Sequence, residues 1–269
     1  PGVREVIPVA IRRWRKQLTK TATWREIAAF RQQIAAKPYA AVIDTQGLVK
    51  SALLARRAKG PRLGYAADSA REPLAARCYD RTFHIARDLH AVVRNRLLAA
   101  AALGYATAGE PDYGIDTVPG AFPWLPHRPY VVFLTATSRD DKLWPETNWL
   151  ALGRHLNSLG FSCVLPGGSA VERERASRLA SAIPGAVAAP AMSIPDLAGL
   201  LAGARAVVGV DTGLTHLAAA LKIPTVAIYT ATDPGLTGVL GAGFYRNLGG
   251  KAQIPAAEAV LGELQAVLA

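Results

Sequence analysis

The chain has 269 residues, of which 51% are hydrophobic and 19% are charged, and it contains only two cysteines. The length and balance predict a globular protein of two domains. No apolar run approaches the length of a membrane-spanning helix, which argues against an integral membrane protein. Because Cys78 and Cys163 lie far apart and lack metal-ligand spacing, they favour a reducing compartment, and we expect the cytoplasm.

The net charge of +11 is concentrated in the first half of the chain. Residues 1–127 carry 20 Lys and Arg against 10 Asp and Glu, whereas residues 128–269 carry 11 against 10. A basic half beside a neutral half indicates an acidic partner for one domain, and nucleic acid, anionic lipid or a phosphorylated sugar would each fit. A basic surface that only keeps the protein soluble is the alternative.

The N-terminal region predicts a short strand over residues 5–10, followed by the basic run IRRWRK. The chain starts without Met, and we expect the first strand and loop of the first domain to be missing from it. We expect the basic run to form a loop after the strand, with guanidinium groups able to fork onto phosphates. Trp14 is then expected to offer a flat apolar surface beside the cations, a combination that also fits single-stranded nucleic acid.

The rest of the first half predicts alternating strands and helices. Strands are expected over residues 39–44 and 62–65 and helices over 24–36, 48–58 and 90–103. Residues 104–129 hold five prolines and little periodicity, which is typical of a linker. The predicted boundary lies near His127, giving domains of residues 1–127 and 128–269.

The second half predicts a parallel sheet with polar turns along one edge. Apolar runs that predict strands alternate with helical segments, and the strands are expected over residues 130–134, 161–165, 186–189, 207–210 and 225–229. In open α/β sheets, ligands bind at the carboxyl ends of the strands. The polar turns that follow these strands should therefore converge on one site.

The turn Asp211-Thr212-Gly213 is the centre of this pattern. It follows a β-branched run and precedes a helix, so unpaired N–H groups at the helix start would suit an anion. The alternative is that Asp211 or Thr212 only caps the helix. Capping alone does not explain His216, one turn further on, where an apolar residue would serve packing better.

Three other turns supply polar groups on the same edge. Thr137, Ser138 and Lys142 precede a helix and resemble a phosphate cradle in outline. Glu172 lies near a helix start, where the alternative is that it complements the helix dipole. Met192 is the only Met and lies in a loop at this edge, although such a residue is usually a core gap-filler. Together these parts suit a nucleoside diphosphate.

Familiar nucleotide motifs are absent. The chain has no G-x-x-x-x-G-K-[ST] loop, which argues against a P-loop ATPase, and no G-x-G-x-x-G follows a predicted strand, which argues against a nicotinamide dehydrogenase.

With VDTGLTHL, TATSRDDKLWPE and ATDPG, and with IRRWRK, DTQGLVKS and SAREPLA, the chain resembles glycosyltransferase family 9 over essentially its whole length. These are the heptosyltransferases of lipopolysaccharide inner-core assembly, and the resemblance is greatest to the heptosyltransferase I branch. It implies two Rossmann-like α/β domains of the GT-B type facing across a cleft, with the first domain incomplete here. It also implies transfer of L-glycero-D-manno-heptose from ADP-heptose to a Kdo residue of Kdo2-lipid A, with inversion.

The resemblance also assigns roles. The catalytic residues would be Lys142 and Asp211, while the general base is expected in the missing N-terminal loop. The donor would be bound by Thr137, Ser138, Lys142, Glu172, Met192, Asp211, Thr212, Gly213 and His216. The anionic lipid A acceptor would be bound by Arg12, Arg13, Arg15, Lys16 and Arg71. No metal, no cofactor besides the donor and no nucleic acid are expected, and the enzyme would contact the cytoplasmic face of the inner membrane peripherally.

Three alternatives remain. Heptosyltransferase II would use a heptose acceptor. A non-catalytic nucleotide- or nucleic-acid-binding module would explain the basic half but not the second set of polar turns. A sugar-phosphate epimerase should carry a Tyr-x-x-x-Lys pair beside a nicotinamide site, and the sequence shows neither.

Overall fold

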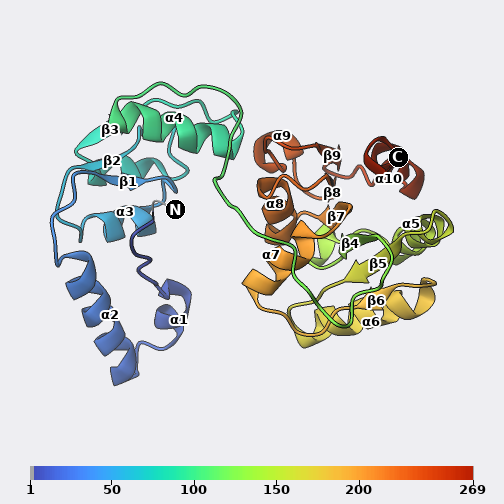
Figure 1. The fold of residues 1–269 in the computed structure, drawn as a ribbon. Coiled ribbons are helices and arrows are strands. Elements are labelled where there is room, and N and C mark those ends of the chain that lie inside the picture. The colour runs from blue at the N-terminus through green and yellow to red at the C-terminus, as the bar shows by residue number, and fades with distance from the viewer. Residues whose placement is uncertain (1–2, 269) are drawn as a thin grey trace. The chain divides into compact units, whose positions relative to one another are not determined.

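The computed structural model describes residues 3–268 of the chain. Contacts divide it into two units, one up to Ala108 and one from Gly109 on. Each unit contains a sheet in which all strand pairs are parallel, with helices beside it (Figure 1). The predicted α/β class is therefore confirmed for both halves.

The first unit contains a small three-stranded sheet in the order β1-β2-β3. Its strands are β1 (Val42–Asp44), β2 (Arg62–Tyr65) and β3 (Arg81–Phe83). Its helices are α1 (Ile11–Lys16), α2 (Thr21–Ile34), α3 (Val49–Ala55), the 3-10 helix η1 (Pro73–Cys78) and α4 (Ala91–Leu103). Tyr65, Ala70 and Leu98 form its buried cluster.

The predictions for residues 5–16 are wrong in two respects. Residues 5–10 form no strand, and the basic run is helix α1, not a loop. Val6 and Val9 are exposed, so a strand here would have no apolar layer to cover. The helix instead buries Trp14, whose indole packs 5.9 Å from the Phe30 ring and donates Nε1–H to Glu26 Oε2 at 2.8 Å. Trp14 therefore attaches α1 to α2 and is not a surface for a ligand.

Asp44 organises the turn that follows β1. Its buried carboxylate accepts hydrogen bonds from the Gln46 backbone N–H at 2.9 Å, Ser51 Oγ at 2.7 Å and the Tyr79 hydroxyl at 2.8 Å. Gly47 adopts a φ of +61°, a left-handed conformation that favours glycine. The carboxylate thus fixes the turn from inside and is satisfied by the protein itself.

The second unit is built on a six-stranded sheet in the order β6-β5-β4-β7-β8-β9. Along the chain this is the order 3-2-1-4-5-6 of the Rossmann fold, which reverses direction between β4 and β7. The strands are β4 (Tyr130–Leu134), β5 (Ser162–Leu165), β6 (Val187–Ala188), β7 (Ala206–Val210), β8 (Thr225–Tyr229) and β9 (Tyr245–Gly249). The first five strands confirm the predicted ones.

The helices of this unit also follow the predicted pattern. They are the 3-10 helix η2 (Asp140–Lys142), α5 (Glu146–Ser158), α6 (Ala170–Ala182), α7 (Ile194–Ala202), α8 (Gly213–Ala220), α9 (Pro234–Thr237) and α10 (Ala257–Leu268). Sequence reasoning missed α9 and β9. The β9 sequence YRNLG has no apolar run, because an edge strand is less completely covered than a central one.

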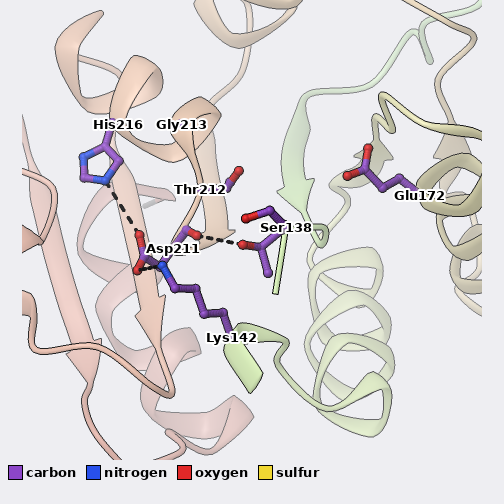
Figure 2. Close-up of a pocket in the computed structure, with 8 residues that line it drawn as sticks. Ser138, Lys142, Glu172, Asp211, Thr212, Gly213 and His216 are labelled. Atoms are coloured by element: carbon purple, nitrogen blue, oxygen red, sulfur yellow. Dashed lines mark hydrogen bonds and ion pairs between the residues drawn. The ribbon is translucent and has the colours of Figure 1, made fainter. Parts of the chain in front are cut away.

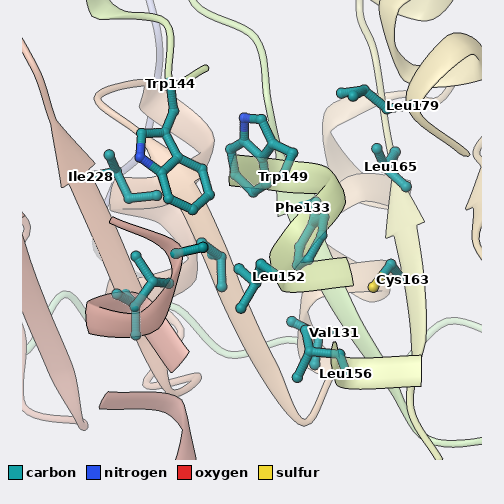
Figure 3. Close-up of a cluster of buried hydrophobic side chains, with 14 of the residues drawn as sticks. Val131, Phe133, Trp144, Trp149, Leu152, Leu156, Cys163, Leu165, Leu179 and Ile228 are labelled. Atoms are coloured by element: carbon teal, nitrogen blue, oxygen red, sulfur yellow. The ribbon is translucent and has the colours of Figure 1, made fainter. Parts of the chain in front are cut away.

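A tryptophan pair anchors the largest core cluster of this unit. Trp149 is fully buried, and its ring lies 4.9 Å from the rings of both Phe133 and Trp144 (Figure 3). Trp144 is also fully buried and donates its indole N–H to the Pro255 carbonyl at 2.8 Å. The segment between β4 and α5 is therefore fixed at both ends, by the strand and by Trp144.

The predicted boundary near His127 differs from the observed division after Ala108. The segment after Ala108 packs on the second unit: the Gly120 N–H donates to the Gly199 carbonyl at 3.0 Å, and the Tyr113 hydroxyl donates to the Leu240 carbonyl at 2.8 Å. Further along, Phe122, Trp124 and Leu125 pack against a core cluster of this unit. Prolines exclude regular helices here, but they do not prevent aromatic side chains from packing.

We expect Trp149→Ala to lower the free energy of unfolding by about 3–5 kcal/mol, because it removes a fully buried ring from a packed cluster. Urea denaturation followed by circular dichroism measures this loss. Leu159, which is 50% exposed, provides the control, and Leu159→Ala should change stability by less than about 0.5 kcal/mol. Equal effects of the two substitutions would contradict the described core.

Candidate active site

A pocket of about 470 Å³ gathers the polar turns of the second unit at the carboxyl ends of its strands. This volume lies within the range of small-molecule sites. Figure 2 shows Lys142 and Asp211 directed toward one another, with Glu172 on the other side of the pocket. The lining residues are eight of the nine predicted donor-binding residues: Thr137, Ser138, Lys142, Glu172, Asp211, Thr212, Gly213 and His216.

The strand register explains why these turns meet. Leu134 at the end of β4 pairs with Gly209 in β7, so the segments after the two strands leave the sheet side by side. This is the point where the strand order reverses, the usual ligand position in such sheets. Gly209 also makes room for helix α8, since a Cβ there would lie 2.2 Å from Thr215 Oγ1. That hydroxyl donates to the Val210 carbonyl at 2.7 Å and fixes the helix start.

Asp211 connects the turns of the site. Its Oδ2 accepts hydrogen bonds from Lys142 Nζ and from Thr232 Oγ1, each at 2.7 Å, and His216 Nε2 lies 3.9 Å from Oδ1. The Asp211 carbonyl accepts a hydrogen bond from Thr137 Oγ1 at 3.1 Å. The Lys142 and Asp211 side chains are only 18% and 12% exposed, so water screens the pair weakly.

These contacts determine the ionisation of Asp211. Burial alone would raise the pKa of the carboxyl, but the contacts from His216, Lys142 and Thr232 and the Lys142 charge outweigh burial and lower the pKa well below its ordinary value. A carboxylate with so low a pKa is a weak base at neutral pH. Asp211 therefore holds Lys142 in place through this ion pair, and its catalytic role stays a prediction.

The start of helix α8 opens onto the same pocket. Thr212 occupies the N-cap position without a side-chain capping hydrogen bond, so it does not cap the helix as the alternative supposed. Gly213 is exposed, and a Cβ added there would meet no atom within 4 Å. The first backbone N–H groups and the positive end of the helix dipole are therefore available to an anion beside Lys142.

Glu172 has two roles in the structure. Its Oε2 accepts the Gly168 and Ser169 backbone N–H groups at 2.9 and 2.8 Å, while Ser169 Oγ accepts the Glu172 N–H at 3.2 Å. These bonds form a capping box at the start of α6. The side chain nevertheless lines the pocket. Glu172 therefore stabilises the start of α6, as the alternative supposed, and it also lies at the ligand edge of the sheet, as predicted. Its contact with a ribose stays a prediction.

Met192 does not line the pocket. It is half-buried and packs against the cluster that includes Leu197 and Leu200. The core-filling alternative describes it better, and contact with an adenine would require the base to extend beyond the pocket toward the turn before α7.

The predicted acceptor residues lie on the first unit and none lines the pocket. Arg12, Arg15 and Lys16 are exposed on α1, and Arg71 is exposed in the segment after β2. Arg13 is already paired, since its Nη2 lies 2.7 Å from Glu26 Oε2.

Sequence reasoning missed Thr232 and Arg175. Thr232 lies in the ATDPG turn after β8 and shares the Asp211 carboxylate with Lys142. Arg175 is a half-buried residue of α6 whose Nη2 donates to the Trp144 carbonyl at 3.1 Å and whose Nε lies 3.7 Å from Glu146 Oε1. Burial lowers its pKa, and the neighbouring Glu146 carboxylate opposes that shift. The sequence could have indicated Arg175 by its spacing, because a residue three positions after Glu172 lies on the same face of the helix.

The groups with which the pocket can attract an anionic ligand are the Lys142 ammonium and the backbone N–H groups at the start of α8. In the described part of the chain, no group of three or more His, Cys, Asp and Glu side chains is arranged to hold a metal ion. Independence from metals stays a prediction.

The family model for glycosyltransferase family 9 (heptosyltransferase) matches residues 27–267. The chain belongs to this family. It is therefore a glycosyltransferase of family 9, as the motifs around Asp211 predicted. Among curated relatives, it is 49% identical over 249 residues to lipopolysaccharide heptosyltransferase 1 of Pseudomonas aeruginosa, covering 90% of this chain and 68% of that protein. The Escherichia coli K12 protein of the same name is 48% identical, with 89% and 76% covered.

Solved structures of heptosyltransferases support the fold. The Escherichia coli heptosyltransferase WaaC with ADP matches with a TM-score of 0.87 and 43% identity, covering 98% of this chain and 84% of that one. The same enzyme with ADP-2-deoxy-2-fluoro heptose matches equally well, at 42% identity. Escherichia coli heptosyltransferase II matches with a TM-score of 0.69 and 23% identity, which shows the fold alone. The predicted Rossmann-like α/β class is thus confirmed.

Asp211→Asn should destabilise the protein at neutral pH and have little effect in acid. Because the folded-state pKa of Asp211 is lowered, its charge stabilises the fold above the unfolded-state pKa near 4, and this contribution is lost as the pH falls toward the folded-state pKa. We expect a loss of about 2 kcal/mol at pH 7 that shrinks steadily below about pH 4. Denaturant unfolding across this pH range measures it. A difference that is the same at both ends of the range would contradict the assignment.

Arg175→Met should weaken ADP binding on the order of tenfold, because it frees both α6 and the segment that carries Lys142. Isothermal titration calorimetry measures the affinity. Arg178→Met is a matched control, since Arg178 pairs with the same Glu146 carboxylate at 2.8 Å but is 57% exposed. Arg175→Lys should restore part of the affinity. Equal losses for the Arg175 and Arg178 variants would contradict this positioning role.

Proposed function

We propose that the chain transfers L-glycero-D-manno-heptose from ADP-heptose to a Kdo residue of Kdo2-lipid A, with inversion at the anomeric carbon, during assembly of the lipopolysaccharide inner core. The observation that carries the proposal is the convergence of Lys142, Asp211 and the start of α8 on one pocket at the switch point of a family 9 chain. The identity of 42–43% to an enzyme solved with ADP and with ADP-2-deoxy-2-fluoro heptose supports an ADP-sugar donor.

The pocket offers a separate group to each part of such a donor. Lys142 and the N–H groups at Gly213 suit the two phosphates, with the Ser138 hydroxyl beside them as a further donor. The Thr137 hydroxyl also lines the pocket, but it already donates to the Asp211 carbonyl. Glu172 is oriented by its capping bonds and suits a ribose hydroxyl. His216, whose side chain is 42% exposed, lies on the pocket wall where the sugar would follow the second phosphate.

In the proposed reaction, a base removes the proton from the acceptor hydroxyl, and the hydroxyl oxygen attacks the anomeric carbon from the face opposite the leaving group. The bond from that carbon to the phosphate oxygen breaks, and ADP leaves with the electron pair. Lys142 and the helix α8 dipole would stabilise the negative charge that grows on the diphosphate. Asp211 is too weak a base for the first step, and we assign the proton acceptor to no residue of the pocket.

The basic first half suits the proposed acceptor. The exposed cations Arg12, Arg15, Lys16 and Arg71 would face the Kdo carboxylates and lipid A phosphates. A lipid acceptor also implies peripheral contact with the cytoplasmic face of the inner membrane. No helix in residues 3–268 combines the length and apolar character needed to cross a bilayer.

Heptosyltransferase II activity is the nearest alternative. The 43% identity to WaaC against 23% to the Escherichia coli heptosyltransferase II favours the Kdo acceptor. A nucleic-acid-binding module would account for the basic first half of the chain, but it would not explain why the second unit holds the half-buried Lys142–Asp211 pair in a pocket.

The test is turnover by the full-length protein with purified ADP-heptose and either Kdo2-lipid A or its singly heptosylated product. We expect heptose transfer to Kdo2-lipid A alone, an inverted anomeric configuration by NMR, and unchanged rates in EDTA. Transfer only to the heptosylated acceptor would favour heptosyltransferase II activity, and no transfer to either acceptor would refute the proposal.

Lys142→Ala should lower kcat about 100- to 1,000-fold, because it removes a preorganised cation from the leaving diphosphate. Lys222→Ala is the matched control: Lys222 also pairs with an aspartate of the same unit, Asp112 at 3.0 Å, but it is 52% exposed and outside the pocket. It should retain normal turnover. Near-normal turnover of Lys142→Ala with an intact fold by circular dichroism would refute the role of Lys142.

A further inference from the structure

We propose that the turn between α1 and α2 docks the protein on a bilayer that contains anionic phospholipid. We call residues 16–25 the hairpin tip. The inference rests on the proposed function, in which the acceptor is a lipid, and it names the surface that would touch the membrane and the side chains that would enter it.

The hairpin tip holds two large apolar side chains outward. Leu18 is 51% exposed and Trp24 is 55% exposed. They are neighbours, because Trp24 donates its indole N–H to the Leu18 carbonyl at 2.8 Å. The turn itself is closed by backbone bonds from Gln17 to Trp14 and from Lys20 to Gln17, each at 3.0 Å. The exposed pair therefore sits on a fixed turn. Within the first unit, Figure 1 shows the end of α1 and the start of α2 directed away from strands β1–β3.

Trp24 differs from the other four tryptophans of the chain. Trp14, Trp144 and Trp149 are buried in packed clusters or contacts, and Trp124 is half-buried against the second unit. Because the Trp24 N–H is satisfied by the backbone, its ring can enter an apolar phase without losing a hydrogen bond. Tryptophan is enriched at the membrane–water interface for its combination of an apolar ring and a polar edge.

Positive charges predominate in the segment that carries the pair, and the nearest carboxylate along the chain, Glu26, is paired with Arg13. Residues 11–25 contain six Lys and Arg and no Asp or Glu. Arg13 pairs with Glu26, but the other five are exposed and, among the described residues, none of them is in an ion pair: Arg12, Arg15, Lys16, Lys20 and Arg25. Cations that surround exposed Trp and Leu side chains are the pattern of an interfacial anchor on anionic lipid.

The observations favour lipid over nucleic acid. Aromatic and basic residues together also suit single-stranded nucleic acid, whose bases stack on rings. An aliphatic Leu18 beside the ring adds apolar area but no stacking surface. Docking at the tip would also bring Arg12 and Lys16 of α1, which are predicted to bind the acceptor, to the surface in which a lipid acceptor is embedded.

Co-sedimentation of the full-length protein with vesicles tests the proposal. We expect binding to equimolar phosphatidylglycerol and phosphatidylcholine, weak binding to phosphatidylcholine alone, and release at high salt. Lys20→Gln and Arg25→Gln should each weaken binding about fivefold. Leu18→Ser and Trp24→Ser should also weaken it, although both keep every charge. The matched control is Arg154→Gln with Leu159→Ser on the second unit, which removes one exposed cation and one exposed apolar side chain and should bind normally.

Tryptophan fluorescence adds a readout specific to the tip. Vesicles should shift the emission of the wild type to shorter wavelength, and Trp24→Phe should abolish that shift while co-sedimentation persists. Normal ADP affinity of the tip variants, with normal turnover on detergent-dispersed acceptor, would separate docking from catalysis. Absence of turnover by the wild type would refute the proposed function instead. Unchanged vesicle binding by the four tip variants, a persistent shift in Trp24→Phe, or preference for a single-stranded oligonucleotide over vesicles would overturn the docking proposal.

Discussion

The ion pair between Lys142 and Asp211 is the interaction on which the candidate site depends. It joins the segments that follow β4 and β7, the two strands between which the sheet order reverses. Removing both charges from water carries a desolvation cost, so such a pair is weak evidence for stability by itself. Its position gives it a physical purpose, because a cation fixed before the ligand arrives stabilises developing negative charge without reorganisation. The site in this view is a preorganised Lys142 ammonium beside the N-terminus of α8, and Asp211 supplies the orientation of that ammonium.

The surrounding structure restrains this pair from several directions. Buried Trp144 and the Arg175 bond to its carbonyl hold the end of the segment that carries Lys142. Thr232 lies in the turn after β8, and its hydroxyl donates a hydrogen bond to the same Asp211 carboxylate. The turns after three neighbouring strands, β4, β7 and β8, thus meet at the Asp211 carboxylate. The site therefore depends on the parallel topology that brings these turns together, and no single motif could form it. The first unit has a comparable arrangement on a smaller scale, where buried Asp44 fixes the turn after β1.

Most of this site was predictable from the sequence. Fully buried parallel strands have β-branched apolar sequences that are easy to identify, and their carboxyl ends must lie at one edge of the sheet. Features set by side-chain packing were not predictable. Nothing local distinguishes an IRRWRK loop from a helix, and the deciding contact, Trp14 against α2, involves residues more than ten positions away. The proline-rich composition of the segment before β4 predicted a linker, and it gave no indication that the aromatic side chains of this segment pack on the second unit. Thr232 was visible as part of a polar turn, but its partner is fixed only by the three-dimensional fold.

A double-mutant cycle on ADP affinity tests the central claim most directly. The protein and its Lys142→Ala, Asp211→Asn and doubly substituted variants would be titrated with ADP by calorimetry under identical salt and pH. If Asp211 acts by holding Lys142, each single substitution should weaken binding, and adding Asp211→Asn to Lys142→Ala should change the affinity little, a coupling of about 1–2 kcal/mol. Fully additive losses would mean that the two residues bind the donor independently, and they would contradict the account.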